Sequence, residues 1–424
     1  MAPEALKVVV VGQGYVGLPL AMQAVEAGHV VVGIDIDETR VNLLANGESF
    51  VEDISAEILQ AALRTGRYQP TMNFANGEGF DVAVITVPTP LIEGAPYLGL
   101  IEQAGRSLAP LVHPGCTVIL ESTTYPGTTE ELLVPLLETG SQLVAGVDFQ
   151  VGFSPERIDP GNKKWRLRNT PKVVSGIDSR SLKAVKDFYD TIVETTVPVQ
   201  NPKVAELTKL LENTFRHINI ALVNELAIFA AQLGIDIWDV IEAASTKPFG
   251  FLPFTPGPGV GGHCLPIDPR YLAWRVEQKL GRPFRFVALA QEINEYMPDY
   301  VVQRLMIGLN TKQRALSGSR ILLLGLSYKA NSSDARESPA IGVANRLVAL
   351  GAVVAAADPH LDATFELEGV RRVDLSREEL AMADAVVVLT DHDAFDAELV
   401  LSNATYIFDT RHWLREPRGN VEYL

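Results

Sequence analysis

A glycine-rich turn close to the start of the chain constrains the fold more than any other stretch. Residues 7–11 form a continuous apolar run, as in a buried parallel strand, and Gly-Gln-Gly-Tyr-Val-Gly follows at 12–17. A helical segment at 18–27 and a second apolar run at 30–34 come next, and that run ends at Asp35. Strand, glycine turn, helix, strand and acid in this order are the fingerprint of a dinucleotide-binding Rossmann unit.

The chemistry of this fingerprint favours NAD as the cofactor. The glycines let the turn approach a pyrophosphate, which the free N–H groups and the dipole of the helix N-terminus attract. Asp35 can accept hydrogen bonds from ribose hydroxyls, and with Asp37 nearby its charge would repel the 2′-phosphate of NADP. The expected cofactor contacts in this unit are Gly12, Gly14, Tyr15, Val16, Gly17 and Asp35.

Three further strand-like runs each end in a small, polar or proline-rich turn. The runs lie at 81–87, 117–120 and 149–153, and the turns at 88–90, 121–124 and 154–156. Ligands of open α/β sheets lie beyond the carboxyl ends of the strands, so we expect these turns to line the cofactor and substrate crevice. Pro88 and Thr89 are placed at the cofactor on this ground. For any single turn, an ordinary loop is an equally good interpretation.

The longest helical pattern covers residues 202–233. Its apolar residues recur at steps of three and four, so they form one broad face that we expect to be buried against another domain or a second subunit. Lys209 and Asn213 are four residues apart on a different face, where their side chains can converge on one point. Lysine and asparagine on a helix are more often surface residues, and this pair alone would not identify a site.

A loop rich in glycine and proline presents a cysteine. Residues 256–269 read Pro-Gly-Pro-Gly-Val-Gly-Gly-His-Cys-Leu-Pro-Ile-Asp-Pro, which excludes a helix or a central strand. We expect a shaped loop that presents Cys264, with Asp268 four residues later. A buried cysteine acting as a small hydrophobe is the alternative. Residues 268–290 then have a helical pattern.

The last third of the chain repeats the opening theme. An apolar run at 320–325, a glycine turn and a helix from about Pro339 precede a strand at 353–357 that ends at Asp358. Further strands are expected at 385–389 and 406–408. The loop at 327–338 contains Lys329 and Arg336, which suits a phosphate or uridine contact; a helix-capping loop is the alternative.

We therefore expect an α/β protein with two Rossmann-like doubly wound domains, joined by a long central helix and a helical middle domain. The expected boundaries are 1–200 for an NAD-binding domain, 201–314 for a central helical domain and 315–424 for a nucleotide-sugar-binding domain. A chain of 424 residues is long enough for such a division.

Composition limits the partners and the compartment. Two cysteines exclude a disulfide framework and fit a reducing environment. A formal charge of −16 argues against nucleic acid and against an acidic membrane surface. No signal peptide or apolar membrane span is recognised, so a soluble, cytoplasmic protein is expected. We also expect no metal site.

The whole chain resembles the UDP-glucose/UDP-N-acetylmannosamine dehydrogenase family. The resemblance rests on the first Rossmann domain, the long helix, the glycine-rich cysteine loop and the second Rossmann-like domain. His263 and Ile267 stand where the UDP-glucose branch usually has serine and lysine. Thr-Lys-Pro-Phe-Gly-Phe at 246–251 looks most like the UDP-N-acetylglucosamine 6-dehydrogenases.

The resemblance implies a four-electron oxidation of a sugar C6 alcohol to a carboxylate, with two NAD consumed. Cys264 is expected to add to the intermediate aldehyde as a thiohemiacetal, whose oxidation gives a thioester that water hydrolyses. Lys209 and Asn213 would stabilise the oxyanion and Asp268 would handle protons, while Thr123 and Glu156 match positions near an active-site water.

The resemblance also assigns binding roles. The expected substrate contacts are Glu156, Arg157, Lys209, Asn213, Lys247, Phe254, Gly261 and Lys329, and Thr123 and Arg336 join the cofactor contacts. Dimers are the basic unit of the family, so a homodimer or a multiple of dimers is expected.

Two other functions fit parts of the chain. A two-electron dehydrogenase of the 6-phosphogluconate or hydroxyacid type shares the Rossmann domain and the long helix but needs no cysteine. A non-catalytic NAD-binding sensor is the other alternative. For the nucleotide-sugar dehydrogenase itself, UDP-glucose or dTDP-glucose is the alternative substrate.

Overall fold

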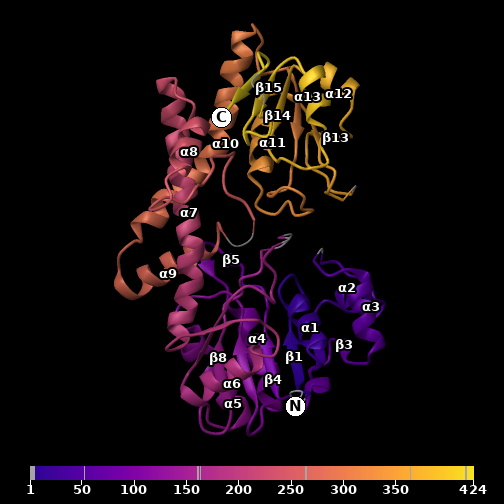
Figure 1. Cartoon of the computed structure of the whole chain (residues 1–424), viewed down its shortest axis with the longest axis vertical. Coiled ribbons are helices and arrows are strands. Elements are labelled where there is room, and N and C mark those ends of the chain that lie inside the picture. The colour runs from indigo at the N-terminus through magenta and orange to yellow at the C-terminus, as the bar shows by residue number, and fades with distance from the viewer. Residues whose placement is uncertain are drawn as a thin grey trace. The chain divides into compact units, whose positions relative to one another are not determined.

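The computed structural model describes residues 5–51, 53–159, 162, 164–262, 265–362, 364–415 and 418–424. The chain forms two compact units, one of residues 1–212 with 270–282 and one of residues 213–269 with 283–424 (Figure 1). No helix within the described part of the chain is long and apolar enough to cross a membrane.

The first unit is built on an eight-stranded sheet in the order β10-β9-β8-β7-β4-β1-β2-β3. Its strands are β1 (Lys7–Val11), β2 (Val30–Ile34), β3 (Tyr68–Thr71), β4 (Val82–Ile85), β7 (Thr117–Leu120), β8 (Gln150–Phe153), β9 (Lys172–Gly176) and β10 (Thr196–Pro198). All neighbours are parallel except β8 and β9. A two-stranded hairpin, β5 (Leu91–Ile92) and β6 (Ala95–Pro96), follows β4.

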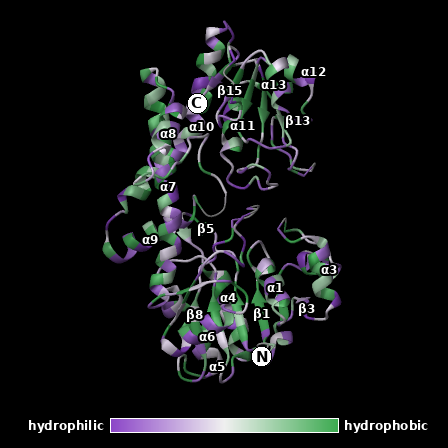
Figure 2. Cartoon of the chain, viewed as in Figure 1, coloured by the Kyte–Doolittle hydropathy of each residue, from purple (hydrophilic) through white to green (hydrophobic). Residues whose placement is uncertain are grey.

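Helices cover both faces of this sheet because its strands are apolar on both sides. Val8 and Val10 belong to one buried cluster, whereas Val9 and Val11 belong to another, as the alternation of side chains along a strand requires. Figure 2 shows these strands as hydrophobic ribbons between more polar helices. The helices are α1 (Gly17–Glu26), α2 (Glu38–Ala45), α3 (Ala56–Arg64), α4 (Gly99–Leu108), α5 (Val134–Ser141) and α6 (Ser179–Tyr189).

The second unit contains a six-stranded parallel sheet in the order β13-β12-β11-β14-β15-β16. Counted along the chain this is the Rossmann order, which the first unit shows in β3-β2-β1-β4-β7-β8. The strands are β11 (Arg320–Leu324), β12 (Val353–Ala357), β13 (Val370–Arg372), β14 (Ala385–Val388), β15 (Ile407–Asp409) and β16 (Val421–Tyr423), with helices α11 (Pro339–Ala349), α12 (Arg377–Met382) and α13 (Ala397–Asn403). The expected fold class is confirmed.

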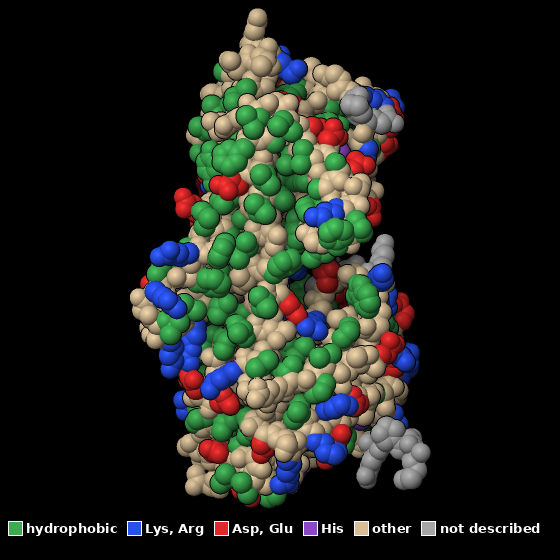
Figure 3. Space-filling view, turned by 60° about the vertical axis from the view of Figure 1, so that its left-hand side comes forward, with side chains coloured by type: hydrophobic (Ala, Val, Ile, Leu, Met, Phe, Trp, Pro, Cys, Tyr) green, Lys and Arg blue, Asp and Glu red, His purple; other side chains and the backbone are tan. Residues whose placement is uncertain are grey.

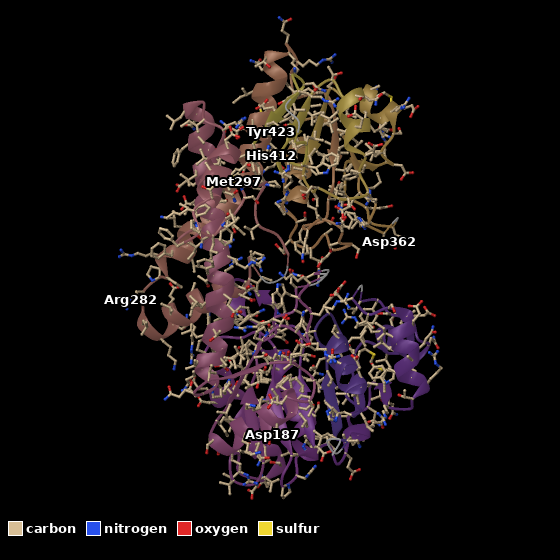
Figure 4. The ribbon with its side chains drawn as sticks, in the orientation of Figure 1. Asp187, Arg282, Met297, Asp362, His412 and Tyr423 are labelled. Atoms are coloured by element: carbon tan, nitrogen blue, oxygen red, sulfur yellow. The ribbon has the colours of Figure 1, made fainter. Side chains whose placement is uncertain are left out.

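Four helices make up the middle of the chain: α7 (Pro202–Leu233), α8 (Ile237–Ser245), α9 (Asp268–Leu280) and α10 (Arg285–Thr311). Helix α10 packs on the second sheet, because Met297, Val301 and Leu305 share a buried cluster with its strands. Helix α8 joins the same unit through Trp238, whose ring stacks on His412 at 4.8 Å; His412 and Tyr423 lie side by side in Figure 4.

The expectation of one helix over residues 268–290 was wrong. Helix α9 ends at Leu280 and α10 begins at Arg285. Gly281 between them has a φ of +64°, and Pro283 offers no backbone donor, so an α-helix cannot continue through this stretch.

Helix α7 has the expected bounds and two different faces. Its apolar stripe is exposed in the single chain; the most exposed members are Leu233 at 73%, Leu211 at 63% and Leu222 at 52%. Figure 3, turned so that this side of the molecule comes forward, shows hydrophobic side chains gathered along the helix. The chain buries a mixed face instead, which includes Lys209 and Asn213.

Candidate functional site

The glycine turn after β1 is shaped for a bound pyrophosphate. Gly12 has a φ of +94°, and a Cβ on Gly17 would lie 1.8 Å from the carbonyl oxygen of Gly12, so a side chain is excluded at either position. A Cβ on Gly14 would meet nothing within 4 Å, so the turn is open at this position. These residues fit NAD, because the backbone of the turn and the start of α1 offer N–H groups to an anion.

Asp35 holds the glycine turn and keeps acceptor capacity for the hydroxyls of a ribose. Its carboxylate accepts the backbone N–H of Gln13 at 2.8 Å and that of Asp37 at 3.0 Å. The guanidinium of Arg40 lies 3.9 Å from Asp35 and 3.6 Å from Asp37. Sequence reasoning did not anticipate this cation, which partly offsets the negative charge beside the ribose position.

Two of the strand-end turns are joined by hydrogen bonds. Thr89, after β4, donates from Oγ1 to the carbonyl of Thr123, after β7, at 2.8 Å. The hydroxyl of Tyr271, a fully buried residue of α9, donates to the carbonyl of Thr89. The structure therefore brings together Thr89 and Thr123, while the neighbouring Pro88 is exposed.

Glu156 and Lys209 meet in a buried contact. Each residue is 7% exposed, and the Lys209 ammonium donates to the Glu156 carbonyl at 2.7 Å and to its Oε2 at 3.2 Å. Burial raises the pKa of the Glu156 carboxyl, although the charge of Lys209 opposes the rise. Oε1 of Glu156 is buried without a hydrogen-bond partner among the described residues, so it can accept from a water or a hydroxyl of a ligand.

Asn213, one turn further along α7, holds the start of α9. Its Nδ2 donates to Oδ2 of Asp268, and both residues are buried. Lys209 and Asn213 thus share one buried face of α7, as their spacing predicted, and each contacts an acidic residue expected at the site.

The glycine loop before the cysteine is held on several sides. Asn224 of α7 accepts the backbone N–H of Gly257 at 3.0 Å and donates to Asn294 of α10 at 2.9 Å. A Cβ on Gly261 would lie 2.7 Å from the carbonyl of Glu337, and one on Gly262 would lie 2.7 Å from the ring of Tyr328. The glycines therefore allow the loop to pack directly on the segment between β11 and α11.

The predicted nucleophile, Cys264, and the neighbouring His263 lie outside the described residues. Their roles stay predictions from the sequence. The glycine loop up to Gly262 and the chain from Leu265 onward are described, so both sides of the cysteine are placed.

In the second sheet, Asp358 occupies the position that Asp35 has in the first. Its Oδ2 accepts the N–H groups of Leu326 and Ser327 at 2.7 and 3.0 Å, and it lies 3.1 Å from Nε2 of His392. Burial by itself would raise the pKa of Asp358, but the His392 and backbone hydrogen bonds hold it well below its usual range. Nδ1 of His392 accepts the N–H of Asn331 at 2.9 Å, so the cluster fixes the loop after β11.

Other predicted contact residues have different surroundings. Arg157 donates to the carbonyl of Pro171 at 2.8 Å and pairs with Glu212. Arg336 is exposed and forms a bidentate pair with Asp334 at 2.9 and 2.6 Å. Lys247 is exposed over the ring of Phe249, Phe254 stacks edge-on against Phe215, and Lys329 is half-buried.

Sequence reasoning missed several residues that support the site. Tyr271, Tyr328 and the Asn224–Asn294 pair are examples. Only Asn224 carried a usable signal, because it lies on the helical stripe that contains Lys209 and Asn213. The others become neighbours of the site through tertiary packing that no local pattern records.

Three family models match the chain in succession. They are the NAD binding domain of the UDP-glucose/GDP-mannose dehydrogenase family over residues 6–193, its central domain over 203–296 and its UDP binding domain over 322–416. UDP-N-acetyl-D-glucosamine 6-dehydrogenase of Salmonella typhi is 37% identical over 399 residues, which are 92% of this chain and 91% of the relative.

Solved structures agree over nearly the whole length. The UDP-D-ManNAc dehydrogenase of Pyrococcus horikoshii has a TM-score of 0.90 and 33% identity, with 99% of this chain and 98% of that chain covered. A UDP-glucose dehydrogenase of Pyrobaculum islandicum has a TM-score of 0.86 and 27% identity, with 99% and 97% covered.

Proposed function

We propose, from the premise that the chain belongs to the UDP-glucose/GDP-mannose dehydrogenase family, that it oxidises C6 of a UDP-N-acetylhexosamine to the uronate. The family is one of NAD-dependent nucleotide-sugar dehydrogenases, so the reaction class and the cofactor follow from membership. The identity of the sugar and the roles of individual residues are the proposed parts.

The observation that carries the proposal is the pair of buried contacts on α7. Lys209 is held against Glu156, and Asn213 against Asp268, one helical turn apart. An ammonium and an amide donor so placed can stabilise an oxygen that becomes negatively charged when a nucleophile adds to an aldehyde. A two-electron dehydrogenase would need no such nucleophile.

Each residue then has a defined task. The Cys264 thiolate adds to the C6 aldehyde and gives a thiohemiacetal. Loss of a hydride to NAD and of a proton would convert this adduct to a thioester, which water then cleaves. Lys209 and Asn213 stabilise the oxyanion, Asp268 exchanges protons, and Glu156 with Thr123 orients the water. The turn at 12–17 and Asp35 would hold NAD, which would accept the hydride in each of the two oxidations.

Binding roles complete the site. Arg157, Lys247, Phe254, Gly261 and Lys329 are proposed substrate contacts, and Pro88, Thr89 and Arg336 proposed cofactor contacts. We divide these tasks among an NAD-binding domain at 1–200, a central domain at 201–314 and a UDP-sugar-binding domain at 315–424. The three successive family matches support this division.

The choice of an N-acetylated sugar is supported by relatives and by the cysteine loop. The Salmonella typhi and Pyrococcus horikoshii proteins are named for UDP-N-acetylglucosamine and UDP-ManNAc. His263 and Ile267 stand where the UDP-glucose branch usually has serine and lysine. We also infer a cytoplasmic location, because nucleotide sugars and NAD are metabolites of that compartment.

We propose a homodimer, or a multiple of one, that covers the exposed apolar stripe of α7. Contiguous apolar surface of this kind marks an interface more often than a solvent-facing surface. The members with the greatest exposure are Leu233, Leu211, Leu222, Phe229, Leu226 and Phe215.

A substrate panel tests the function. The purified protein is incubated with NAD and with UDP-GlcNAc, UDP-ManNAc, UDP-glucose or dTDP-glucose, and NADH is followed by absorbance. We expect the highest kcat/KM with an N-acetylated sugar and two NADH per sugar consumed. One NADH per sugar would contradict the four-electron reaction, and turnover of UDP-glucose alone would contradict the proposed sugar.

A further inference from the structure

A fully buried ion pair lies behind the turns that carry Thr123 and Glu156. Lys172 begins β9 and is 1% exposed, while Glu121 follows β7 and is 2% exposed. The Lys172 ammonium donates to Oε1 of Glu121. Tyr189, at the end of α6, donates its hydroxyl to Oε2 of the same carboxylate at 2.5 Å. Neither Lys172 nor Glu121 has a role in the proposed reaction.

This pair is placed where it can control both turns. Glu121 precedes Thr123 by two residues. Lys172 also donates to the carbonyl of Pro155 at 3.0 Å, immediately before Glu156. Because Lys209 donates to the carbonyl of Glu156 at 2.7 Å, two lysines from different elements hold successive carbonyls. The backbone at Glu156 is therefore fixed on both sides.

Stability alone is a weak reason for such a pair. Desolvation of two charges offsets most of their attraction, and apolar residues of similar volume often serve the fold as well. The pair instead provides what apolar residues cannot: a donor for the Pro155 carbonyl and a fixed charge beside the site.

We propose that Lys172 and Glu121 are positioning residues of the substrate site, which fix the turn at 154–156 and balance the charge around the Glu156 carboxylate. The inference rests on the proposed role of Glu156. It extends that role to two residues that do not touch the reacting atoms.

The charges around Glu156 predict the direction in which each substitution shifts its pKa. Burial raises the pKa of the Glu156 carboxyl. The charges of Lys209 on α7 and Lys172 on β9 lower this pKa, whereas the charge of Glu121 raises it. The influence of Lys172 is larger than that of Glu121. Loss of Lys172 should therefore raise this pKa, and loss of Glu121 should lower it. Tyr189 contacts both members of the pair: its hydroxyl is hydrogen-bonded to Glu121, and the Lys172 ammonium lies 5.1 Å from the centroid of its ring.

The test compares the pH dependence of kcat/KM for four proteins with the preferred sugar and saturating NAD. These are the wild type, Lys172→Met, Glu121→Gln and the double variant. If Glu156 works as a carboxylate, activity falls as the pH drops through its pKa. We expect the acidic limb to move to higher pH in Lys172→Met and to lower pH in Glu121→Gln.

The double variant guards against misfolding, because it leaves no unpaired charge in the interior. Gln at position 121 can still accept from Tyr189. Since Lys172 has the larger influence, the acidic limb of the double variant should move to higher pH, by less than in Lys172→Met. In the double variant we expect kcat to fall by about 10- to 100-fold, as for a misplaced catalytic group, while the KM for NAD is unchanged.

A matched control is Lys183→Met on α6. Lys183 pairs with Asp187, which is labelled in Figure 4, and their side chains are 76% and 58% exposed. This variant should keep the wild-type rate and pH profile. Thermal unfolding of every variant separates loss of fold from loss of function.

The outcomes are distinguishable. Two results would overturn the positioning role and leave the proposed function intact. One is a folded double variant with a normal kcat. The other is a set of variants whose acidic limbs of kcat/KM do not move while the rate falls equally at every pH. A wild-type protein that reduces no NAD with any sugar of the panel would overturn the function, and the inference with it.

Discussion

Asp35 and Asp358 follow the second strand of their sheets, yet their carboxylates are used differently. A carboxylate offers about four lone-pair sites. Asp35 accepts from two backbone N–H groups and keeps capacity for a ribose. The donors around Asp358 come from Leu326, Ser327, His360, Leu361 and His392. The second sheet therefore has the Rossmann order without a free acid for a dinucleotide.

The use of Asp35 predicts the cofactor preference. We expect kcat/KM with NAD to exceed that with NADP by at least about 10-fold, because the 2′-phosphate would lie beside a carboxylate. Asp35→Ala should narrow that ratio, since Arg40 would remain as the nearest charge. Glu57→Ala, which removes an exposed carboxylate on α3 of the same unit, serves as the control. Equal efficiency of the two cofactors in the wild type would refute the assignment.

Cys264 tests the chemistry at a single atom. Cys264→Ser keeps nearly the same size but offers a hydroxyl that is almost un-ionised at neutral pH. We expect steady-state turnover to fall by roughly several orders of magnitude, as for removal of a nucleophile, while sugar-nucleotide binding persists. Rapid-quench analysis should reveal bound aldehyde or ester. A near-normal rate with two NADH per sugar would exclude the covalent mechanism.

The control for that variant is Cys116→Ser. Cys116 is 1% exposed directly before β7, and burial raises the pKa of its thiol, so it is a structural residue with little thiolate. Its replacement should lower thermal stability more than kcat.

At the scale of elements, periodicity predicted most of the fold. The runs at 7–11, 30–34, 117–120 and 353–357 are strands with those bounds, because buried parallel strands are apolar throughout. Strands β3, β9, β10, β13 and β16 of the two sheets were not identified. Each mixes polar or aromatic residues with few apolar ones and is defined by pairing with a neighbour, which no local pattern shows.

Helix α7 carries the prediction about assembly. Leu211 and Leu222 lie on its exposed stripe, so Leu211→Asp with Leu222→Asp would place two charges in an apolar interface. We expect sedimentation to show a monomer at micromolar concentration, where the wild type is a dimer or a larger assembly. The control is Met382→Asp, at an exposed site on α12. A wild-type monomer would contradict the dimer.

The candidate site was predictable only in part. Glycine spacing indicated the nucleotide turn, and helical spacing placed Lys209 and Asn213 on one face. Their partners, Glu156 and Asp268, were named through the family resemblance, since nothing local connects residues about fifty positions apart in the chain. The Lys172–Glu121 pair had no signal at all, because a charged residue at a strand end is usually solvated.

At the scale of the whole molecule, the two compact units allow a test of Asp358. Its lowered pKa means that it stabilises the folded state above its unfolded pKa of about 4, and that this stabilisation is lost as the pH falls through the folded pKa. Asp358→Asn should therefore destabilise the unit of residues 213–269 and 283–424 at pH 7, by roughly 1–3 kcal/mol.

Calorimetry between about pH 7 and pH 3 measures the difference from the wild type, which should narrow toward the acidic end. Asp374→Asn is the control, because Asp374 is an exposed carboxylate of the same unit. A difference that is constant over this pH range would contradict the role of the ionised carboxylate.

The division of the chain into units has a consequence for recombination between relatives. The boundary at 212/213 falls inside α7, so a crossover there would separate Lys209 from Asn213. The boundary at 269/270 falls inside α9, so a crossover there would cut that helix near its start. The boundary at 282/283 falls between α9 and α10. Since α10 packs on the second sheet, a donor segment that begins at residue 283 would bring its own support. Chimaeras joined there should fold where the donor keeps the partners of residues 213–269, such as Asn294 for Asn224 and His412 for Trp238. They would exchange the loop with Lys329 while the residues of α7 stay in place.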